Sequence, residues 1–500
     1  MSKQPTEHYD VAIIGFGPVG ATLANLLGKC GVSVLILDRE AAAYHLPRAV
    51  HFDDEVMRVF QTVGLGDAIA ANLRVNPGMR FVANDGTLLL DWPRPQQISP
   101  QGWYASYRCH QPDIEKVLRE GLERYPHVTV RTLCEVVNLE EQCDRAMLEY
   151  HDLREEKTVT VSANYVVGCD GANSLVRRFI ETGMEDLGFS ERWLVVDVLL
   201  NREKPELGDY TIQYCNPERP ATYVRGPGNR RRWEITVKDD EPSEEMISPD
   251  AVWSLLQPWL DSSEAELERS AVYTFNSKIV HHWRKGRFLL AGDAAHLTPP
   301  FMGQGMCAGI RDVANLGWKL ALCVTAQAPD SLLDTYGTER YPHVREYIGT
   351  AVRLGGLINT CGTEEALNAA LYSQDGSARM TSIYPALGRG MSVAGQTACL
   401  FPQPRLKDGT LSDDRHGYGF ALLSDPRALP LSAAQLEQLK AKNIALLQTD
   451  QSEDLAQYLE QFKAHAVLVR PDRYLLGTAC NQAELQQLLD RSLVTPAQCV

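Results

Sequence analysis

Apolar residues at the N-terminus follow the spacing of a strand, a helix and a second strand. Residues 11–14 form a short apolar run typical of a buried parallel strand. Leu23, Leu26 and Leu27 then recur at helical spacing, and a second apolar run covers residues 32–37. This order predicts a β-α-β unit in which both strands belong to one parallel sheet.

In the middle of the chain, apolar and polar residues follow the spacing of an antiparallel sheet. Residues 80–92 alternate between apolar and polar side chains around Asp85-Gly86, which predicts a β-hairpin. Strand-like runs without long helices between them follow at residues 193–200, 210–214, 221–225 and 232–237. They predict an antiparallel sheet inserted into the first domain. Apolar runs typical of buried parallel strands occur again at residues 165–171 and 288–293, and both end in Asp and Gly. Long helices are predicted over residues 308–326 and 332–354.

The C-terminal segment contains strand-like runs separated by polar turns and followed by a helix. The strands are expected at residues 420–423, 444–448, 466–470 and 475–478, and the helix at 482–493. The order favours a small thioredoxin-like α/β module. Because the segment lacks the redox-active CxxC pair, we predict a structural or oligomeric role for it rather than a catalytic one.

Composition narrows the class of protein. A net charge of −15 disfavours nucleic acid as a partner, and the short run at residues 230–232 is expected to be a solvated basic turn. There is no apolar run long enough to span a bilayer and no apolar signal segment, so we expect a cytoplasmic enzyme. The 12 cysteines have no paired spacing, which predicts reduced thiols with neither a disulfide nor a metal site.

A GxGxxG turn, residues 15–20, joins the first strand to the first helix. Gly15 permits the tight turn, Gly17 lets a pyrophosphate approach the backbone, and Gly20 lets the helix pack close to the strand. The helix N-terminus offers free N–H groups to phosphate oxygens. Asp38 lies eighteen residues after Gly20, where it can accept a hydrogen bond from a ribose hydroxyl. A dinucleotide is therefore predicted, although this unit alone does not separate FAD from NAD.

Two later motifs strengthen that prediction. Asp170-Gly171 follows one buried strand, and RFLLAGDAAHLTPP, residues 287–300, contains another that ends at Gly292-Asp293. Ligands of parallel sheets bind at the carboxyl ends of the strands. Asp293 is suited to a polyol hydroxyl, and the Gly303-Gln304-Gly305 turn places the next helix N-terminus toward a flavin ring.

With these three motifs in order, residues 8–350 resemble the single-component FAD-dependent aromatic hydroxylases, the group of p-hydroxybenzoate and phenol hydroxylases. PRAVHFDDE, GQGMCAGIRDVANLGWKLAL and VLVRPDRYLLGTA are most similar to the 3-(3-hydroxyphenyl)propionate hydroxylase branch. Carried over to this sequence, the resemblance implies cofactor contacts at Gly15, Gly17, Pro18, Gly20, Asp38, Arg39, Arg48, Gln111, Asp170, Asp293, Pro300, Gly303, Gly305 and Met306.

The predicted fold is α/β, with a Rossmann-like FAD-binding domain, an inserted antiparallel-sheet substrate domain and a C-terminal thioredoxin-like α/β module. We assign residues 1–78, 102–185 and 270–400 to the FAD-binding domain with its trailing helices, 79–101 and 186–269 to the substrate domain, 401–418 to a linker and 419–500 to the module.

The chemistry implied by the resemblance is attack of an FAD C4a-hydroperoxide, formed with O₂ and NADH or NADPH, on a phenolic ring. A free phenol titrates near pH 10, so the protein must supply a base or an acceptor. The resemblance implies the Pro300 carbonyl as acceptor, and Arg48 completes the predicted catalytic set with His51. We hypothesise that His51 is the base or substrate anchor; the alternative is a loop histidine bonded to backbone. The predicted substrate contacts are Tyr104, Tyr214, Tyr223, Arg225, for a carboxylate side arm, and Phe301.

The sequence therefore predicts a monooxygenase of aromatic catabolism that hydroxylates a 3-(3-hydroxyphenyl)propionate-like substrate, with a homodimer as its assembly. Three alternatives stay open at this stage. They are a hydroxylase of a polycyclic or heteroaromatic metabolite, a non-hydroxylating FAD oxidoreductase such as a halogenase or isoprenoid reductase, and a non-catalytic flavoprotein. The WxWxIP motif of the halogenases is missing.

Overall fold

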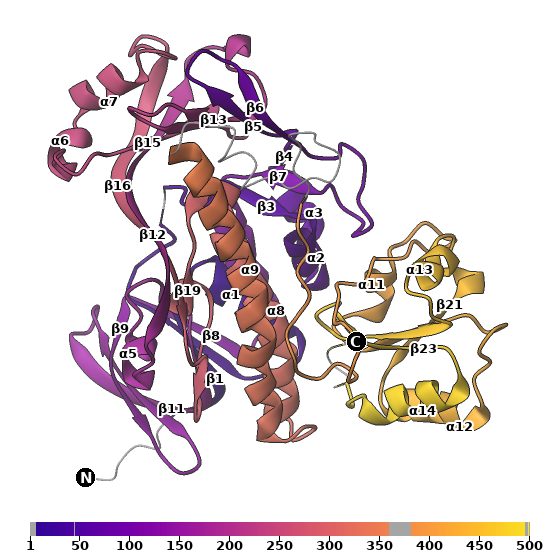
Figure 1. Ribbon diagram of the computed structural model, residues 1–500. Coiled ribbons are helices and arrows are strands. Elements are labelled where there is room, and N and C mark those ends of the chain that lie inside the picture. The colour runs from indigo at the N-terminus through magenta and orange to yellow at the C-terminus, as the bar shows by residue number, and fades with distance from the viewer. Residues whose placement is uncertain (1–6, 45, 360–381, 496–498, 500) are drawn as a thin grey trace.

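The computed structural model describes residues 7–44, 46–359, 382–495 and 499. Figure 1 shows three bodies: a lower one that holds the N-terminal strands, an upper sheet, and a C-terminal body beside the long helices α8 (Gly305–Val324) and α9 (Asp334–Asn359). The predicted fold class is confirmed. The predicted FAD-binding ranges include residues 1–6 and 360–381, which lie outside the described part of the chain.

The lower body is built on a sheet whose central strands are parallel, in the order β18-β11-β1-β2-β8. Its strands are β1 (His8–Ile14), β2 (Val34–Asp38), β8 (Val128–Thr132), β9 (Cys134–Glu141), β10 (Ala146–Asp152), β11 (Lys157–Gly168), β17 (Arg284–Lys285) and β18 (Phe288–Leu290). A small second sheet contains β3 (His51–Asp53), β4 (Arg74–Val75) and β7 (Ser106–Arg108). The shorter helices are α1 (Pro18–Lys29), α2 (Asp54–Thr62), α3 (Gly66–Ala70), α4 (Gln111–Glu120) and α5 (Leu175–Ile180).

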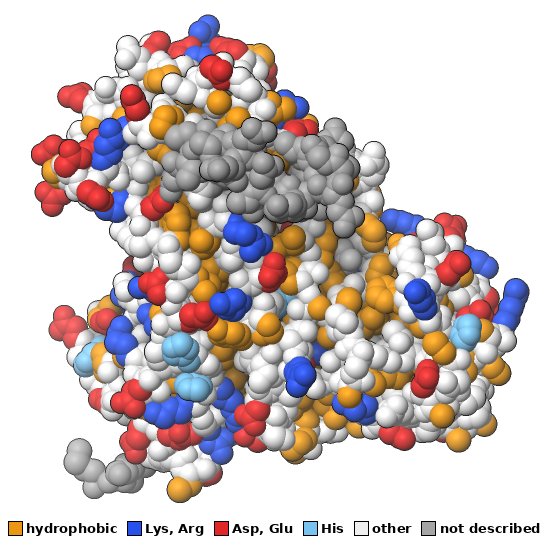
Figure 2. Space-filling view, in the orientation of Figure 1, with side chains coloured by type: hydrophobic (Ala, Val, Ile, Leu, Met, Phe, Trp, Pro, Cys, Tyr) orange, Lys and Arg blue, Asp and Glu red, His pale blue; other side chains and the backbone are white. Residues whose placement is uncertain are grey.

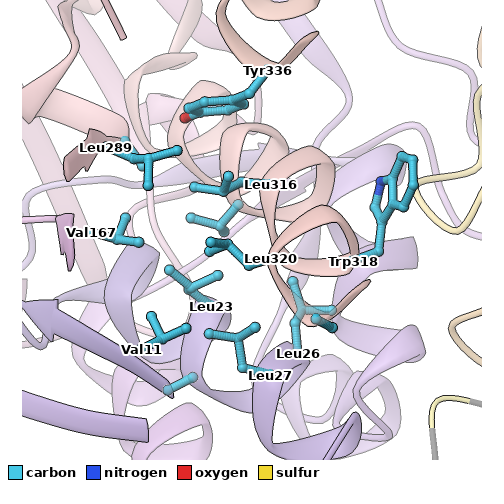
Figure 3. Packing of buried hydrophobic residues seen from close by; sticks show 14 of the residues in the cluster. Val11, Leu23, Leu26, Leu27, Val167, Leu289, Leu316, Trp318, Leu320 and Tyr336 are labelled. Atoms are coloured by element: carbon cyan, nitrogen blue, oxygen red, sulfur yellow. The ribbon is translucent and has the colours of Figure 1, made fainter. Parts of the chain in front are cut away.

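The core of this body lies between the sheet, α1 and α8. Figure 3 shows Leu23 and Leu27 of α1 among Leu316 and Leu320 of α8, with Val11 of β1 beneath them. All five side chains are fully buried, and each contributes about 1.5–3 kcal/mol relative to an exposed position. This packing fixes the N-terminal ends of α1 and α8 above the same edge of the sheet.

The upper body is an eight-stranded sheet in the order β19-β16-β12-β15-β14-β13-β5-β6. Its elements are β5 (Gly78–Ala83), β6 (Leu88–Pro93), β12 (Met184–Leu200), β13 (Thr211–Cys215), β14 (Ala221–Arg225), β15 (Arg230–Thr236), β16 (Ala265–Val280), β19 (His296–Leu297), α6 (Ser243–Met246) and α7 (Pro249–Leu256). The long strands β12 and β16 pair along almost their whole length and pack at one end on the lower core and at the other on the upper one. They tie the two bodies together.

The basic run at residues 230–232 was wrongly predicted to be a solvated turn. It begins strand β15, and the side chains of Arg231 and Arg232 are buried. Arg232 pairs with Asp197 on the neighbouring strand at 2.7 Å, so a buried carboxylate compensates its charge. In contrast, Figure 2 shows Asp and Glu side chains gathered over α6 and α7, where Glu244, Glu245 and Asp250 lie.

The C-terminal body has the predicted thioredoxin-like order. Its strands β20 (Ala421–Ser424), β21 (Ala445–Gln448), β22 (Ala466–Val469) and β23 (Leu475–Ala479) form a sheet in the order β21-β20-β22-β23, in which only β20 and β21 are parallel. Its helices are α11 (Ser412–His416), α12 (Ala433–Ala441), α13 (Leu455–Gln461) and α14 (Gln482–Arg491).

Contacts of segment 401–418 and of Cys30 help to fasten this body to the rest of the chain. Segment 401–418, which was predicted to be a linker, is packed: Arg58 of α2 donates to both carboxylate oxygens of Asp413 and to the Phe401 carbonyl. Cys30, at the end of α1, forms a disulfide with Cys499. This corrects the prediction that no disulfide is present. The two cysteines are 469 residues apart, so no local spacing reveals them.

Among the described residues, no helix is both long and apolar enough to cross a membrane. Nor does that part of the chain contain a cluster of three or more His, Cys, Asp or Glu side chains suited to a metal ion.

Candidate active site

Three motif turns meet at one edge of the lower sheet. Ile14 of β1 pairs with Gly168 of β11, and Gly168 pairs with Leu290 of β18, so these strands end at the same level. The turns that follow them, at Gly15, Asp170 and Gly292, are therefore neighbours. The prediction that these distant segments converge is confirmed.

The glycines of the first turn differ in what surrounds them. A side chain at Gly15, whose φ is +104°, would clash with the Cys169 carbonyl, and one at Gly20 would clash with the Gly15 carbonyl. No atom lies within 4 Å of the position that a Cβ on Gly17 would take. Gly17 precedes α1, and Pro18 is the first residue of that helix. The open space at the helix N-terminus suits a phosphate group.

Asp38 closes β2 beside this turn. Its carboxylate accepts from the Phe16 N–H at 2.6 Å and from the Glu40 N–H at 2.8 Å. Each carboxylate oxygen has a second lone pair, so the side chain can still accept from a ribose hydroxyl. Arg39, another predicted contact, is exposed and pairs with Glu40.

The acids of the other two turns are also suited to hydroxyl groups. One oxygen of Asp170 accepts from the Leu175 and Val176 N–H groups at 2.7 and 3.2 Å, whereas its Oδ1 is buried and has no partner. Asp293 lies in the short 3₁₀ turn Gly292–Ala294, which follows β18, and is exposed. An open glycine cradle, a ribose acceptor and an unpartnered buried acceptor fit the FAD that the sequence implied.

The Arg48 loop is held from both sides. Gln111 accepts from the Ala49 N–H at 2.6 Å, and Arg232 of β15 donates to the Arg48 carbonyl at 2.7 Å. The Arg48 side chain itself is exposed, 4.9 Å from the Tyr44 ring centre. Gln111 and Arg232 therefore act on the loop backbone and leave the Arg48 guanidinium available to a ligand.

A short 3₁₀ turn, Pro300–Met302, leads into α8 on the other side of the site. Gly303 has a φ of +62°, and a Cβ there would lie 3.0 Å from His51 Nδ1, so glycine is required at this position. The Gly303 N–H donates to the Pro300 carbonyl at 2.9 Å. Gly305 has open space around it, and Met306 is half-buried.

His51 is buried between these elements. Its Nε2 lies 2.7 Å from Ser106 Oγ, which also accepts from Asn76, and its Nδ1 lies 3.4 Å from the Gly303 carbonyl. Both contacts tie the ring to its surroundings, as the alternative expects, but the Nδ1 contact is longer than an ordinary hydrogen bond and leaves this nitrogen able to bind a substrate hydroxyl. Burial, with the Arg108 charge nearby, lowers the pKa of His51 to about 3. The imidazole is therefore neutral at pH 7 and a weak base.

A recess opens between the lower and upper bodies next to His51, and its space measures about 540 Å³ including the part open to solvent. We call it the inter-domain recess. It is lined by Val50, His51, Asn76, Gly78, Met79, Trp92, Arg94, Arg108, Thr211, Thr222, Val224, Glu234, Pro300, Phe301, Met302 and Gly303.

Two arginines and a tryptophan in this recess were not among the site residues predicted from the sequence. Trp92 Nε1, Arg94 Nη1 and Arg108 Nε are buried and have no hydrogen-bond partner among the described residues. Burial lowers the pKa of both guanidiniums to about 10, so both keep their charge at pH 7. Glu234 supplies the nearest carboxylate of the lining, and burial raises its pKa.

Among the predicted substrate residues, Phe301 lines the recess and packs edge-on against Trp193. The other four do not line it. Tyr214 packs on Trp259, and Tyr223 packs on Trp233 within the upper core. Arg225 pairs with Asp209, and Tyr104 packs edge-on against Tyr107. Side chains alternate along a strand, so Thr222 and Val224 of β14 face the recess while Tyr223 and Arg225 face away.

Comparison with known families gives two matches. The family described as "FAD binding domain" matches residues 8–351, and "HcaD C-terminal domain" matches residues 398–494. Together they cover the bodies that form the site and the C-terminal body.

Curated relatives extend over most of the chain. "Probable NADH-specific resorcinol 4-hydroxylase" of Rhodococcus jostii is 39% identical over 505 residues, which cover 96% of this chain and 93% of the relative. "3-(3-hydroxy-phenyl)propionate/3-hydroxycinnamic acid hydroxylase" of Mycolicibacterium smegmatis is 33% identical over 94% of this chain and 90% of its own.

Solved structures share the whole fold at lower identity. The flavin-dependent monooxygenase PieE, solved with FAD and substrate, has a TM-score of 0.82 at 21% identity and covers 98% of this chain and 99% of its own. Aklavinone-11 hydroxylase, solved with FAD and aklavinone, has a TM-score of 0.78 at 21% identity, with 98% of this chain and 99% of its own covered.

Proposed function

This chain belongs to the FAD binding domain family, as an FAD-dependent aromatic hydroxylase, and we propose that its substrate is a phenol with a carboxylate side chain. Such a substrate is similar to 3-(3-hydroxyphenyl)propionate, which the name of one relative contains. The inter-domain recess is the proposed binding site.

The observation that carries this proposal is the set of unpartnered donors in the recess. Buried polar groups in proteins are almost always hydrogen-bonded. Within the described part of the chain, however, Trp92, Arg94 and Arg108 each have a buried N–H without a partner. An anionic ligand satisfies such donors, and a carboxylate bonded to a guanidinium makes strong charge-assisted hydrogen bonds. Two positive charges against one carboxyl group of Glu234 leave the lining electropositive, which favours an anion.

The residues of the chain then have distinct tasks. When bound and reduced by a nicotinamide, FAD would activate O₂, so that one oxygen atom of O₂ enters the ring and the other leaves as water. Gly303 and Gly305 present the start of α8 to the flavin, and Arg94 and Arg108 orient the ring by its side chain. The Pro300 carbonyl has a second lone pair and can accept from the phenol. Phe301 and Met302 are buried apolar residues of the lining and exclude water from the reacting atoms.

His51 is proposed to hold the substrate hydroxyl rather than to act as a free base. A base with a pKa of about 3 gives no titration between pH 6 and 7, so the pH profile of hydroxylation should lack a His51 step there. Replacing His51 with Ala should lower the amount of product formed per NADH at least about tenfold, because the substrate ring is no longer held in position for hydroxylation. NADH oxidation should continue and release hydrogen peroxide. Equal loss of both activities would contradict this role.

We propose NADH as the reductant, because the name of one relative contains "NADH-specific". Initial rates with NADH and NADPH at equal concentration test this choice. The homodimer and the cytoplasmic location stay predictions from the sequence, and light scattering on the purified protein tests the first.

A second candidate substrate is a neutral dihydroxybenzene. It is favoured by the relative named as a resorcinol hydroxylase, whose match covers 96% of this chain. A neutral ring leaves the charges of Arg94 and Arg108 without a counter-ion, so we rank it below a carboxylate-bearing phenol.

The deciding experiment compares 3-(3-hydroxyphenyl)propionate with resorcinol on the FAD-loaded protein, with product identified by mass spectrometry. We expect hydroxylated product from the first with a kcat/KM at least about tenfold higher. The ethyl ester of the first substrate is the matched control, because it keeps the ring and lacks the negative charge. Equal turnover of acid and ester would overturn the proposal.

A further inference from the structure

One side chain of the C-terminal body enters the hydrogen-bond network beneath the active site. Tyr474 lies just before β23 and is buried. Its hydroxyl lies 2.8 Å from Glu55 Oε1 on α2 and 3.0 Å from His343 Nε2 on α9. A residue of the third body thus bridges two helices that belong to the FAD-binding body, beside which Figure 1 shows it.

The direction of these hydrogen bonds follows from their partners. Arg340 donates to His343 Nδ1 at 3.0 Å, because a guanidinium has no acceptor. A neutral His343 then carries its proton on Nε2 and donates to the Tyr474 hydroxyl, which donates in turn to Glu55. Burial lowers the pKa of His343 and raises that of Tyr474, so both groups keep these protonation states at neutral pH.

One branch of the network runs to the turn expected to face the flavin. Arg311 donates to Glu55, to Asp53 at 2.5 Å and to Gln304 at 3.0 Å. Gln304 lies between Gly303 and Gly305 and caps α8, and Asp53 follows His51 in β3. Glu55 therefore fixes the guanidinium that joins the His51 strand to the start of α8.

The other branch runs to the Gly292-Asp293 turn. Arg340 Nε donates to Asp312 Oδ1 at 2.8 Å. The other oxygen of Asp312 accepts from the Gly292 N–H at 3.0 Å and lies 2.6 Å from His296 Nε2. All the side chains of this branch are buried.

We propose that Tyr474 is a positioning residue of the active site, whose hydroxyl holds the Gly303 turn and the Gly292 turn in one arrangement. The C-terminal body is then part of the oxygenating machinery and not only an assembly module.

Docking of the C-terminal body does not require this hydroxyl. Arg470 makes two hydrogen bonds of 2.8 Å to Glu339 of α9, and Arg58 and Asp413 form a second buried ion pair. Buried pairs of this kind anchor the body strongly, since removing one partner leaves a buried charge. Tyr474 differs from them because its bonds continue to both flavin-facing turns.

The test compares two Tyr→Phe variants of the FAD-loaded protein. Tyr418 also lies in the C-terminal body, and its buried hydroxyl bonds the Ala314 carbonyl at 2.8 Å and the Trp318 N–H at 3.0 Å. Both variants lose one buried hydroxyl between the same two bodies, so similar losses of thermal stability are expected. Only Tyr474→Phe should weaken FAD binding, measured by flavin fluorescence, and lower product per NADH, each by about tenfold. Tyr418→Phe should leave both within about twofold.

Equal changes in the two variants would overturn the proposal, because they would show a stability effect alone. Glu55→Gln provides a second approach that keeps the shape of the acceptor, so that the conclusion does not depend on folding of one variant. If Tyr474 acts through Glu55, the variant that combines Tyr474→Phe with Glu55→Gln should bind FAD no more weakly than the weaker-binding single variant. Additive losses of FAD affinity would also contradict the proposal. The FAD measurement needs no aromatic substrate, so an incorrect substrate assignment leaves this result interpretable.

Discussion

Replacing Arg94 with methionine is expected to lower kcat/KM for a carboxylate-bearing phenol by about 100-fold, since truncating one partner of a buried charge pair costs about 2–5 kcal/mol. Methionine keeps an unbranched apolar side chain but lacks the guanidinium, whose carbon lies 3.9 Å from the centre of the Trp92 ring. None of the described residues forms a hydrogen bond with Arg94 Nη1. The change therefore removes charge from the recess while the fold around it is kept.

The effect should depend on the substrate. For resorcinol, which has no carboxylate, kcat/KM should stay within about threefold of the wild-type value. Arg108→Met should act in the same direction, with an added loss of stability because Arg108 also donates to Thr211. Arg225→Met is the matched control, since Arg225 pairs with Asp209 outside the recess. Steady-state kinetics on both substrates checks all three variants, and a uniform loss on both would argue for structural damage.

Local sequence patterns were sufficient to predict the part of the site that binds the cofactor. The GxGxxG turn needs only neighbours in sequence, and parallel strands bring their carboxyl ends together once their order is known. Gly15, Asp170 and Gly292 therefore lie where the motifs placed them.

The substrate end depends on sheet register, which short apolar runs do not fix. Tyr223 and Thr222 are adjacent in β14 and face opposite sides, so a choice based on aromatic character selected the residue of the upper core. A one-residue change of register moves every side chain to the other face. Arg94 and Arg108 lie at opposite ends of a proline-rich segment, and only the pairing of β6 with β5 and of β7 with β3 brings them together.

Residue pairs that join the bodies across long sequence distances also could not be predicted from the sequence. Tyr474 and Glu55 are 419 residues apart. Each lies in a stretch that resembles the family, VLVRPDRYLLGTA and PRAVHFDDE, but nothing in these stretches pairs the two residues. The run at residues 230–232 shows the same limit, because exposed arginines and arginines paired with a distant carboxylate have the same local sequence. Burial of a charge is decided by its partner, and the partner is set by the tertiary fold.

Replacing Gly17 with alanine should weaken FAD binding by about 10- to 100-fold while the apoprotein keeps its stability. Gly17 has a φ of −74°, which alanine adopts without strain, and its Cβ would meet no protein atom within 4 Å. The added methyl group occupies the space through which a pyrophosphate approaches the N-terminus of α1. Each hydrogen bond lost to a charged group costs about 1.5–3 kcal/mol, and every 1.4 kcal/mol changes the Kd about tenfold.

Gly15→Ala is the informative comparison, because it concerns the same turn and fails for a different reason. Its φ of +104° is unfavourable for alanine, and the new Cβ would clash with the carbonyl of Cys169, the residue that follows β11. We expect a loss of about 3 kcal/mol or more in folding stability, with or without FAD. Thermal unfolding of the apoprotein together with FAD titration separates the two cases. A Gly17→Ala protein that binds FAD as tightly as wild type would place the pyrophosphate somewhere other than this turn.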